Sequence, residues 1–435
     1  MKWNISMIVL VFLLACSEDT KELIPEDDFS LSATYIFFNG NEDEQQIKVS
    51  NFGSNPIGWS ATVISGDFVQ LRNSQGEIAP ESSGLIVVEV DRQNLEERVY
   101  QSALEVSIGT KSFTLTVEVS GVPSMSFDVG LIDAAYSEKL NAVIAIDNAN
   151  QLHLIDPKNQ FIQTLDLEFP ATCMALSPDG DKVLVGHNYA YSIVDLVNFE
   201  VAQVQGILIE VFDAIYATDE WIYLFPNEDQ WVSIHGYNLV TGEELTSFNN
   251  IREKTIAKKH PTQDFMYGIS TNSTPKDIEK YGYGNRPEIL YETPYHGDYP
   301  IGADLWVNGQ ENYILTQAGS IFRVSDSPAD DLTYLSSLSL GSSLIDAAQF
   351  NHSRNENYLL VSSNSFEETS EVLIYTDTWE LVDRVGFPPV EYDDQLTSEF
   401  NGEHIFFNAL GGEYYVLGSL PQNNSKSAIL NYQLQ

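Results

Sequence analysis

Four aspartates lie in short sequences that recur along the chain. Leu131–Ala135 reads Leu-Ile-Asp-Ala-Ala and returns letter for letter as Leu344–Ala348, while Phe212–Ala214 and Ala303–Leu305 are shorter echoes. Carboxylates brought together by a repeat could hold Ca²⁺ through several oxygens and water. Each could instead accept backbone N–H groups from its own turn or from a neighbouring repeat. The candidate metal site, with this structural alternative left open, consists of Asp133, Asp213, Asp304 and Asp346.

The seven histidines suggest no metal site of their own. None lies at metal-ligand spacing from another histidine or from a cysteine. The sequence also lacks a Gly-x-Ser-x-Gly elbow, a phosphate-binding glycine loop and a dinucleotide fingerprint. A Ser-His-Asp set is recognised by geometry rather than by spacing, so no catalytic residue is assigned.

Two tyrosine-rich segments, Tyr291–Tyr299 and Pro388–Asp394, could bind a ligand. Tyrosine beside carboxylates suits a neutral polyol such as a sugar, because the ring stacks on C–H groups while polar atoms bind hydroxyls. The alternative is that these rings fill gaps between structural units. The candidate ligand-binding residues are Tyr295, His296, Tyr299 and Tyr392.

A repeat spaces these residues along the chain. Asp133 and Asp346 are 213 positions apart, which divides into five units of about 43 residues. That is the length of a four-stranded propeller blade, and one blade cannot bury its apolar faces alone. The repeat therefore predicts an all-β fold with blades around a common axis. Each of the four aspartates would open an innermost strand at the upper mouth of a central channel, where unpaired carboxylates have raised pKa values.

Residues 122–435 alternate short strands with turns. Ser177–Gly180 and Val240–Glu243 have type I turn chemistry, in which glycine takes the strained position. Together these features resemble the YVTN and WD40-like propeller repeats, which implies a β-propeller but no particular activity. We expect seven blades, the last beginning near Leu396 or Phe406, with Ser126–Val129 closing the ring as its outer strand.

Residues 29–121 contain about seven short alternating or apolar runs without helical periodicity, which favours an immunoglobulin-like β-sandwich. Trp59, Gly76–Pro80, Val88–Asp91 and Tyr100 resemble, in order, landmarks of the BACON domains, although Arg98 replaces the glycine expected ahead of Tyr100. That resemblance implies either carbohydrate binding or a spacer. Because no row of exposed aromatic residues is evident, we expect a spacer, with Trp59 in its core.

The N-terminus has the pattern of a processing segment. Lys2 supplies positive charge, and Ile5–Ala15 is apolar but too short to span a bilayer, so residues 1–15 are interpreted as a signal peptide. Leu13–Cys16 resembles a bacterial lipobox, which implies lipidation of Cys16. Ser17–Asp19 resembles the acidic export tag of Bacteroidota surface lipoproteins. Residues 16–28 would then form an acidic tether, and the protein would lie on the outer membrane, facing the exterior.

The charge balance restricts the partners. The chain has 21 Lys and Arg against 63 Asp and Glu, for a net charge of −42. Such a surface repels nucleic acid, because a protein that binds nucleic acid needs clustered Lys and Arg side chains. Once Cys16 is acylated, Cys173 has no partner, which excludes a disulfide framework. The expected partners are the membrane, through the lipid, and a glycan or surface protein; no cofactor beyond Ca²⁺ is expected.

Two functions remain for a propeller of this kind. The first is that of a lipid-anchored surface protein that binds a ligand without catalysing a reaction. The second is an enzyme of the lyase or lactonase type that acts at the central channel with a divalent cation. An enzyme needs a His, Lys or Arg near the carboxylates. The two inner-strand positions that lack the aspartate hold Cys173 and Ile256, which favours binding.

Overall fold

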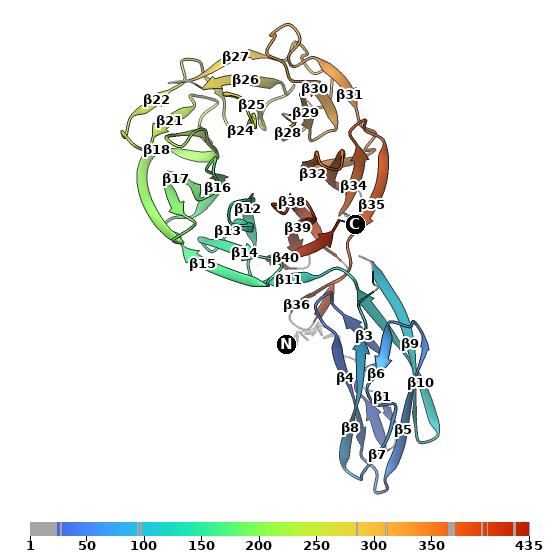
Figure 1. Cartoon of the computed structure of the whole chain (residues 1–435). Helices are drawn as coiled ribbons and strands as arrows, with labels where there is room; N and C mark the ends of the chain where they lie inside the picture. The colour runs from blue at the N-terminus through green and yellow to red at the C-terminus, as the bar shows by residue number, and fades with distance from the viewer. Residues whose placement is uncertain are drawn as a thin grey trace, which may run out of the picture. The chain divides into compact units, whose positions relative to one another are not determined.

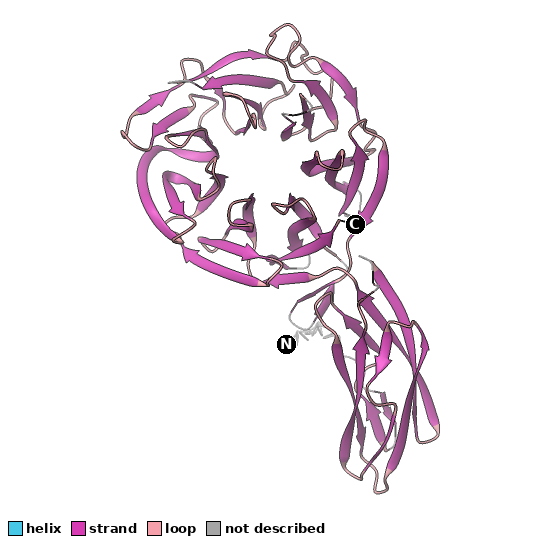
Figure 2. Ribbon diagram, viewed as in Figure 1, coloured by secondary structure: helices cyan, strands magenta, loops and turns pink. Residues whose placement is uncertain are grey.

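The computed structural model describes residues 24–26, 28–93, 95, 98–283, 286–308, 310, 312–363, 370–392, 395–397, 399–420 and 423–434. Every regular element in this part of the chain is a β-strand (Figure 2), so the all-β prediction is confirmed. None of these residues belongs to a helix that is long and apolar enough to cross a membrane. The chain divides into two compact units, Met1–Gly121 and Val122–Gln435. The predicted signal peptide and Cys16 lie outside the described residues.

The first unit contains two five-stranded sheets. One sheet has the order β1 (Ile24–Glu26), β2 (Phe29–Leu31), β4 (Glu44–Asn51), β8 (Ser82–Val90) and β6 (Val69–Leu71). The other has the order β3 (Tyr35–Phe38), β10 (Lys111–Ser120), β9 (Val99–Ile108), β5 (Ile57–Ser65) and β7 (Gln75–Ile78). Alternate residues of both sheets face one shared core, since side chains in a strand alternate between its two faces. Trp59 is part of this core and is 7% exposed.

The second unit is a ring of sheets around a common axis (Figure 1). Four sheets are formed by four consecutive strands each. The first contains β12 (Leu131–Ser137), β13 (Ala142–Asp147), β14 (Gln151–Asp156) and β15 (Phe161–Asp166). The next two such sheets contain β24 (Thr255–Lys259), β25 (Phe265–Ser270), β26 (Ile278–Tyr283) and β27 (Pro287–Glu292), then β28 (Leu305–Asn308), β29 (Tyr313–Thr316), β30 (Ser320–Arg323) and β31 (Tyr334–Ser337). The fourth contains β32 (Ser343–Asn351), β33 (Glu356–Ser363), β34 (Ser370–Thr376) and β35 (Leu381–Gly386).

A six-stranded sheet lies between the first two of these. It contains β16 (Ala171–Leu176), β17 (Lys182–Asp195), β18 (Glu200–Tyr216), β19 (Trp221–Pro226), β21 (His235–Asn238) and β22 (Glu244–Thr246). β17 pairs with β16 up to His187 and with β18 from Asn188 onward, and Tyr189 has a φ of 67°. β18 in turn leaves β17 and pairs with β19 from Val211 onward. The two long strands therefore join two four-stranded sets into one sheet.

The last sheet is closed by a strand from the start of the unit. Its order is β38 (Asn401–Phe407), β39 (Glu413–Leu420), β40 (Asn423–Gln433) and β11 (Ser124–Phe127), with Phe127 opposite Ser427. β11 thus occupies the outer position that the sequence analysis assigned to Ser126–Val129. Two short pairs complete the topology: β20 (Trp231–Val232) with β23 (Ile251–Arg252), and β36 (Val390–Tyr392) with β37 (Gln395–Thr397).

Burial explains why these strands have such different sequences. All six residues of β13 are buried, because the sheet is covered on both faces by its neighbours in the ring. In β15, at the outer edge of the same sheet, four of six residues are exposed. β13, the second strand of its sheet, is therefore a nearly continuous apolar run, whereas the outermost strand tolerates polar residues. The side chains that remain for function lie where the innermost strands begin and in the connections between sheets.

Candidate functional site

Three of the four repeated aspartates occupy one structural position. Asp133 pairs with Ile146 and Asp213 with Phe225, in each case just after a β-bulge residue that the ladder skips. Asp304 immediately precedes Leu305, which pairs with Thr316. In the last sheet the residue that follows the bulge is His404, which pairs with Leu417. Asp133, Asp213, Asp304 and His404 therefore lie at the start of innermost strands around the axis.

Asp346 does not share that position, contrary to the expectation from the repeat. In β32 the ladder skips Asp346 itself, and Ala347 pairs with Leu360 where Asp133 pairs with Ile146. The identical letters are offset by one residue because hairpin geometry and burial set the register of a strand. Oδ2 of Asp346 has no hydrogen-bond partner in the part of the chain that the structure describes. Burial raises the pKa of Asp346 to about 6; the nearby Glu403 charge also raises it, whereas a hydrogen bond from Ser362 opposes the shift.

The aspartate oxygens accept backbone N–H groups. Asp133 Oδ1 accepts from Ala134 N at 2.8 Å, and its Oδ2 accepts from Met174 N on the next inner strand at 2.9 Å. Asp213 Oδ2 accepts from Ala257 N at 2.7 Å, again on the next inner strand. These bonds tie neighbouring sheets together, as the structural alternative requires. Within the described ranges, no group of three or more His, Cys, Asp or Glu side chains could hold a metal ion.

A lysine and a histidine join these aspartates, which the sequence analysis did not anticipate. Lys258 Nζ lies 3.6 Å from Asp304 Oδ1. Burial lowers the pKa of Lys258, but the charges of Asp304, Asp213 and Asp133 outweigh it, so the net shift is upward. The side chain of Lys258 is nonetheless 41% exposed, so solvent screens these interactions. Asp133, Asp213, Asp304, Lys258 and His404 are called the axial cluster.

The electrostatics of the axial cluster are mutually coupled. Burial raises the pKa of Asp213 to about 6, against the opposing charge of Lys258. Burial lowers the pKa of His404, against the opposing charge of Asp133. Cys173 and Ile256 supply no acid or base, as the sequence indicated, but Lys258 and His404 bring such groups to the carboxylates from other positions. Lys258 could have been found as the residue two beyond Ile256, since residues i and i+2 share a strand face.

The four predicted ligand residues do not line one cavity in the described part of the chain. Tyr299 stacks on Tyr334 with ring centroids 3.7 Å apart, and Tyr295 meets Tyr299 edge-on at 4.9 Å. Both belong to the apolar core around β30, as expected if the rings fill gaps. Tyr392 belongs to a different core, and Lys426 Nζ lies 5.2 Å from its ring centroid.

His296 is the exception, because it lines a cavity of about 570 Å³. The cavity lies among β20, β23, β26, β27 and the turn between β25 and β26, and we call it the His296 cavity. Its wall includes Trp231, Arg252, Asp277, Glu279, Tyr291, Glu292 and His296. The turn between β25 and β26 and the connection after β27 both lie on the side where the innermost strands begin, which is the face predicted for the ligand.

Two strands of the small β20–β23 sheet supply one wall of the His296 cavity. Trp231 and Arg252 are directly opposite each other in that sheet. The guanidinium carbon of Arg252 lies 4.4 Å from the centroid of the Trp231 ring, a cation–π contact. Trp231 is 55% exposed, so much of the indole remains available to a ligand.

Carboxylates from the β26–β27 side also line this cavity. Glu279 and Glu292 face each other across β26 and β27, a like-charge pair that disfavours the sheet. Glu279 accepts a hydrogen bond from the Tyr281 hydroxyl at 2.5 Å, and burial raises its pKa, as do the charges of Glu292 and Asp277. Asp277 Oδ2 lies 3.1 Å from His296 Nδ1. The wall thus presents acceptors for hydroxyl groups beside an exposed aromatic ring.

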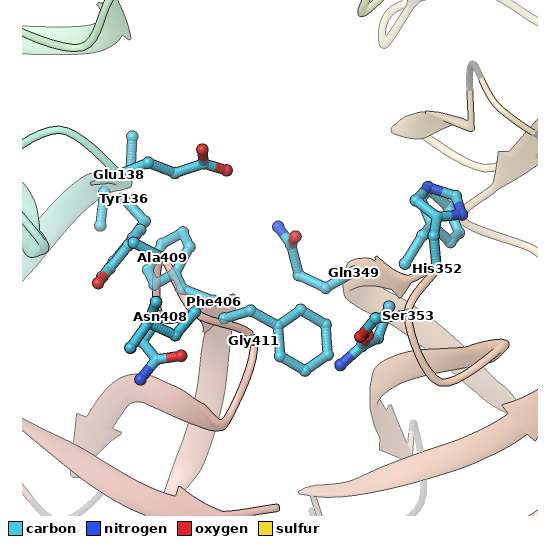
Figure 3. A pocket seen from close by; sticks show the side chains of 15 residues that line it. Tyr136, Glu138, Gln349, His352, Ser353, Phe406, Asn408, Ala409 and Gly411 are labelled. Atoms are coloured by element: carbon cyan, nitrogen blue, oxygen red, sulfur yellow. The ribbon is translucent and has the colours of Figure 1, made fainter.

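A second cavity, of about 630 Å³, is formed by the hairpins that follow β12, β32 and β38. Figure 3 shows the Gln349 amide and the Glu138 carboxylate directed into it. Tyr136 is engaged there, because its hydroxyl donates to Asn141 Oδ1 at 2.8 Å. Leu410 lines the same cavity and is 92% exposed. This cavity offers few charged groups in convergent positions.

Comparisons with known proteins show the fold. No family model matches the chain, and no curated protein matches it. The β-propeller domain of Cps50 (Swd1) from Myceliophteria thermophila is similar in structure, with a TM-score of 0.54 and 12% identity over 72% of this chain and 100% of that one. Kuenenia stuttgartiensis hydrazine synthase has a TM-score of 0.53 and 11% identity over 71% of this chain and 97% of that one. At these identities the likeness concerns the fold alone: the second unit is a β-propeller.

Proposed function

We propose that this protein is a lipid-anchored surface protein whose propeller binds a sugar in the His296 cavity. The lipobox-like sequence that ends at Cys16 supports the anchor, and the acidic sequence after it supports an outer-membrane location facing the exterior. The two sheets of residues 29–121 are proposed to form a BACON-like, immunoglobulin-like sandwich that acts as a spacer. The propeller is proposed to have seven blades, the last of which is completed by β11.

One observation carries the choice of a sugar. An exposed indole, Trp231, lines the same cavity as hydroxyl acceptors on Asp277, Glu279 and Glu292. A pyranose offers a C–H face that stacks on an aromatic ring and a rim of hydroxyl groups that need acceptors. Such a wet site binds weakly, because water competes for each hydroxyl contact.

A glycan array probed with the purified mature chain tests this proposal. We expect Trp231→Ala to weaken binding of the captured glycan by about 10-fold, the loss typical of one aromatic anchor. Phe161→Ala is the matched control, since Phe161 is 51% exposed but lies on β15, outside the cavity. A glycan that binds Trp231→Ala as well as wild type contradicts the site, and an array without any captured glycan contradicts the ligand class.

The axial cluster supports a second candidate function, an enzyme of the lyase or lactonase type. Lys258 and His404 lie among carboxylates, and one of these, Asp213, has a pKa near 6. A group with a pKa near the working pH can exchange protons in both directions, which general acid–base catalysis requires. The proposal of a Ca²⁺ ion bound by the aspartates belongs to this candidate.

Turnover of lactones or of uronate-containing oligosaccharides tests the second candidate. Lys258→Met should abolish any activity of the wild-type chain, whereas Lys139→Met, a substitution at an exposed lysine paired with Asp181, should not. If both variants are equally active, the axial cluster is structural. A chelator that lowers the melting temperature, with recovery on adding Ca²⁺, would support the ion; an unchanged melting curve would contradict it.

A further inference from the structure

We propose that the His296 cavity selects sugars that carry an anionic group, a carboxylate or a sulfate, and that Arg252 recognises this group. The inference rests on the proposed sugar site and names the charge class of its ligand.

Arg252 contacts an aromatic ring, and it makes no ion pair with any residue that the structure describes. Its guanidinium lies against the Trp231 ring, its direct partner across the β20–β23 sheet. A guanidinium that contacts an aromatic ring keeps N–H groups that can donate to a ligand. No ion pair joins Arg252 to a carboxylate of the described residues, although the side chain lines a cavity with three of them.

Among the described residues, Arg252, Arg286 and Arg323 form no ion pair, although acidic residues outnumber basic ones by 63 to 21 in this chain. Arg72, Arg354 and Arg384 each form an ion pair with a glutamate. A guanidinium that is oriented by an aromatic ring and left without a carboxylate can bind one supplied by a ligand, through two parallel N–H···O bonds.

The carboxylates of the cavity do not prevent this. Asp277 is already engaged, since Thr293 Oγ1 donates to its Oδ1 at 3.0 Å and His296 Nδ1 lies 3.1 Å from its Oδ2. Glu279 accepts the Tyr281 hydroxyl. Asp277 immediately precedes β26, Glu279 lies on β26 and Glu292 on β27, whereas Arg252 lies on β23. Arg252 and the carboxylates line the same cavity, so one sugar can place its hydroxyls on the carboxylates and its anionic group on Arg252.

Matched pairs of oligosaccharides test the charge preference. The probes are oligogalacturonate and its fully methyl-esterified form, and a sulfated galactan oligosaccharide and its desulfated form. Binding is measured by calorimetry at physiological ionic strength, where the Debye length is about 8 Å and the long-range repulsion from the net charge of −42 is largely screened. In at least one pair, the wild-type chain should bind the charged member about 10- to 100-fold more tightly, the effect of hydrogen bonds to a charged group.

Arg252→Gln should remove that preference by weakening the charged member to the affinity of the uncharged one, which itself should change less than about twofold. Arg252→Lys keeps the positive charge but lacks the two parallel N–H donors of the guanidinium. It should therefore keep part of the preference that Arg252→Gln loses. Arg384→Gln is the control, because it makes the same charge change on β35, away from the cavity. Melting temperatures establish that each variant is folded.

The outcomes separate this inference from the function on which it rests. If the uncharged sugars bind as tightly as the charged ones and Trp231→Ala weakens both, the sugar site stands and the charge selectivity is wrong. If Arg252→Gln weakens both members of a pair equally, Arg252 only supports Trp231 and the inference is also wrong. If neither member of either pair binds, the anionic ligand class is rejected. Preference for uronate or for sulfate identifies the source of the anionic charge.

Discussion

The environment of the Asp346 carboxylate disfavours its ionised form. Its Oδ2 is buried without a hydrogen-bond partner in the described chain, and Glu403 lies near enough to raise its pKa. A group of this kind lowers the stability of the fold at neutral pH. Natural proteins retain destabilising groups of this kind when the groups have a role. If the role of Asp346 is structural, its substitution lowers the stability of the folded protein.

We expect Asp346→Asn to stabilise the protein at neutral pH. The pKa is about 6 in the folded chain and near 3.8 in the unfolded chain, so the folded chain binds the proton more readily between these values. The contribution of Asp346 to stability is therefore present below about pH 4 and is lost as the pH rises through 6. Because solvent screens the partly exposed carboxylate, we expect a gain of about 1 kcal/mol at about pH 8, shrinking toward about pH 5.

Urea unfolding at the two pH values measures this gain. Asp219→Asn, which makes the same charge change at an exposed turn, should show no comparable pH-dependent gain. A loss of stability at both pH values would mean that the Asp346 carboxylate has a favourable partner, and this account of its pKa would be wrong.

At the scale of elements, the sheets of the propeller are joined by polar contacts as well as by apolar packing. β26 and the turn after β30 share a buried ion pair, Lys280 Nζ to Asp331 Oδ2 at 2.8 Å, with both side chains at most 4% exposed. Asp331 also accepts the hydroxyls of Tyr267 and Tyr291. Lys280 Nζ lies 3.7 Å from the centroid of the Phe265 ring. The pair is thus enclosed by aromatic rings of the β24–β27 sheet, and it joins that sheet to the β30–β31 connection of the next.

The two ends of this ion pair should respond differently to substitution. Asp331→Ala leaves Lys280 buried with only the Ser325 carbonyl as an acceptor, and should cost about 3–5 kcal/mol. Lys280→Met should cost less, because Asp331 keeps three donors: two tyrosine hydroxyls and the Ser325 amide. Urea unfolding of the two variants, with the double variant Lys280→Met/Asp331→Leu, measures the asymmetry. Equal costs for the two single variants would show that the hydrogen-bond partners left to each charge do not decide the cost.

At the scale of the whole molecule, the chain combines an acidic surface with an N-terminal sequence that resembles a lipoprotein signal. The net charge of −42 keeps the protein from anionic surfaces. Attachment to a membrane would therefore depend on the lipid. A single acyl chain binds a membrane only weakly, so stable attachment requires the multiple chains that a lipidated N-terminal cysteine carries.

We expect Cys16→Ala to release the protein from the membrane fraction. The lipobox-like sequence ends at Cys16, and in the described residues no helix offers another anchor. Fractionation of cells that express the wild-type chain or the variant measures this. A variant that stays in the membrane fraction at the wild-type level would show that Cys16 is not the attachment site.

The sequence determined the class of the fold because that information is local. Alternating and apolar runs of about six residues, turns such as Ser177–Gly180, and a repeat of about 43 residues specify strands, hairpins and stacking. Gly180 illustrates this. Its φ of 73° is a conformation that glycine adopts without strain, so the residue type alone indicates a turn at this position. The role of β11 as a closing strand followed from assigning four strands to each blade, which left the last blade without its outer strand.

The sites depended on the tertiary structure, because they combine residues that are distant in sequence and are set by register. A shift of one position in the β32 ladder moved Asp346 out of line with Asp133, although their neighbours in sequence are identical. Lys258 and His404 joined the aspartates only once strands from different sheets surrounded one axis. Trp231 and His296 lie on connections of different sheets, and no spacing in the chain relates them. Local preferences act over a few residues, whereas these contacts exist only after the sheets have packed.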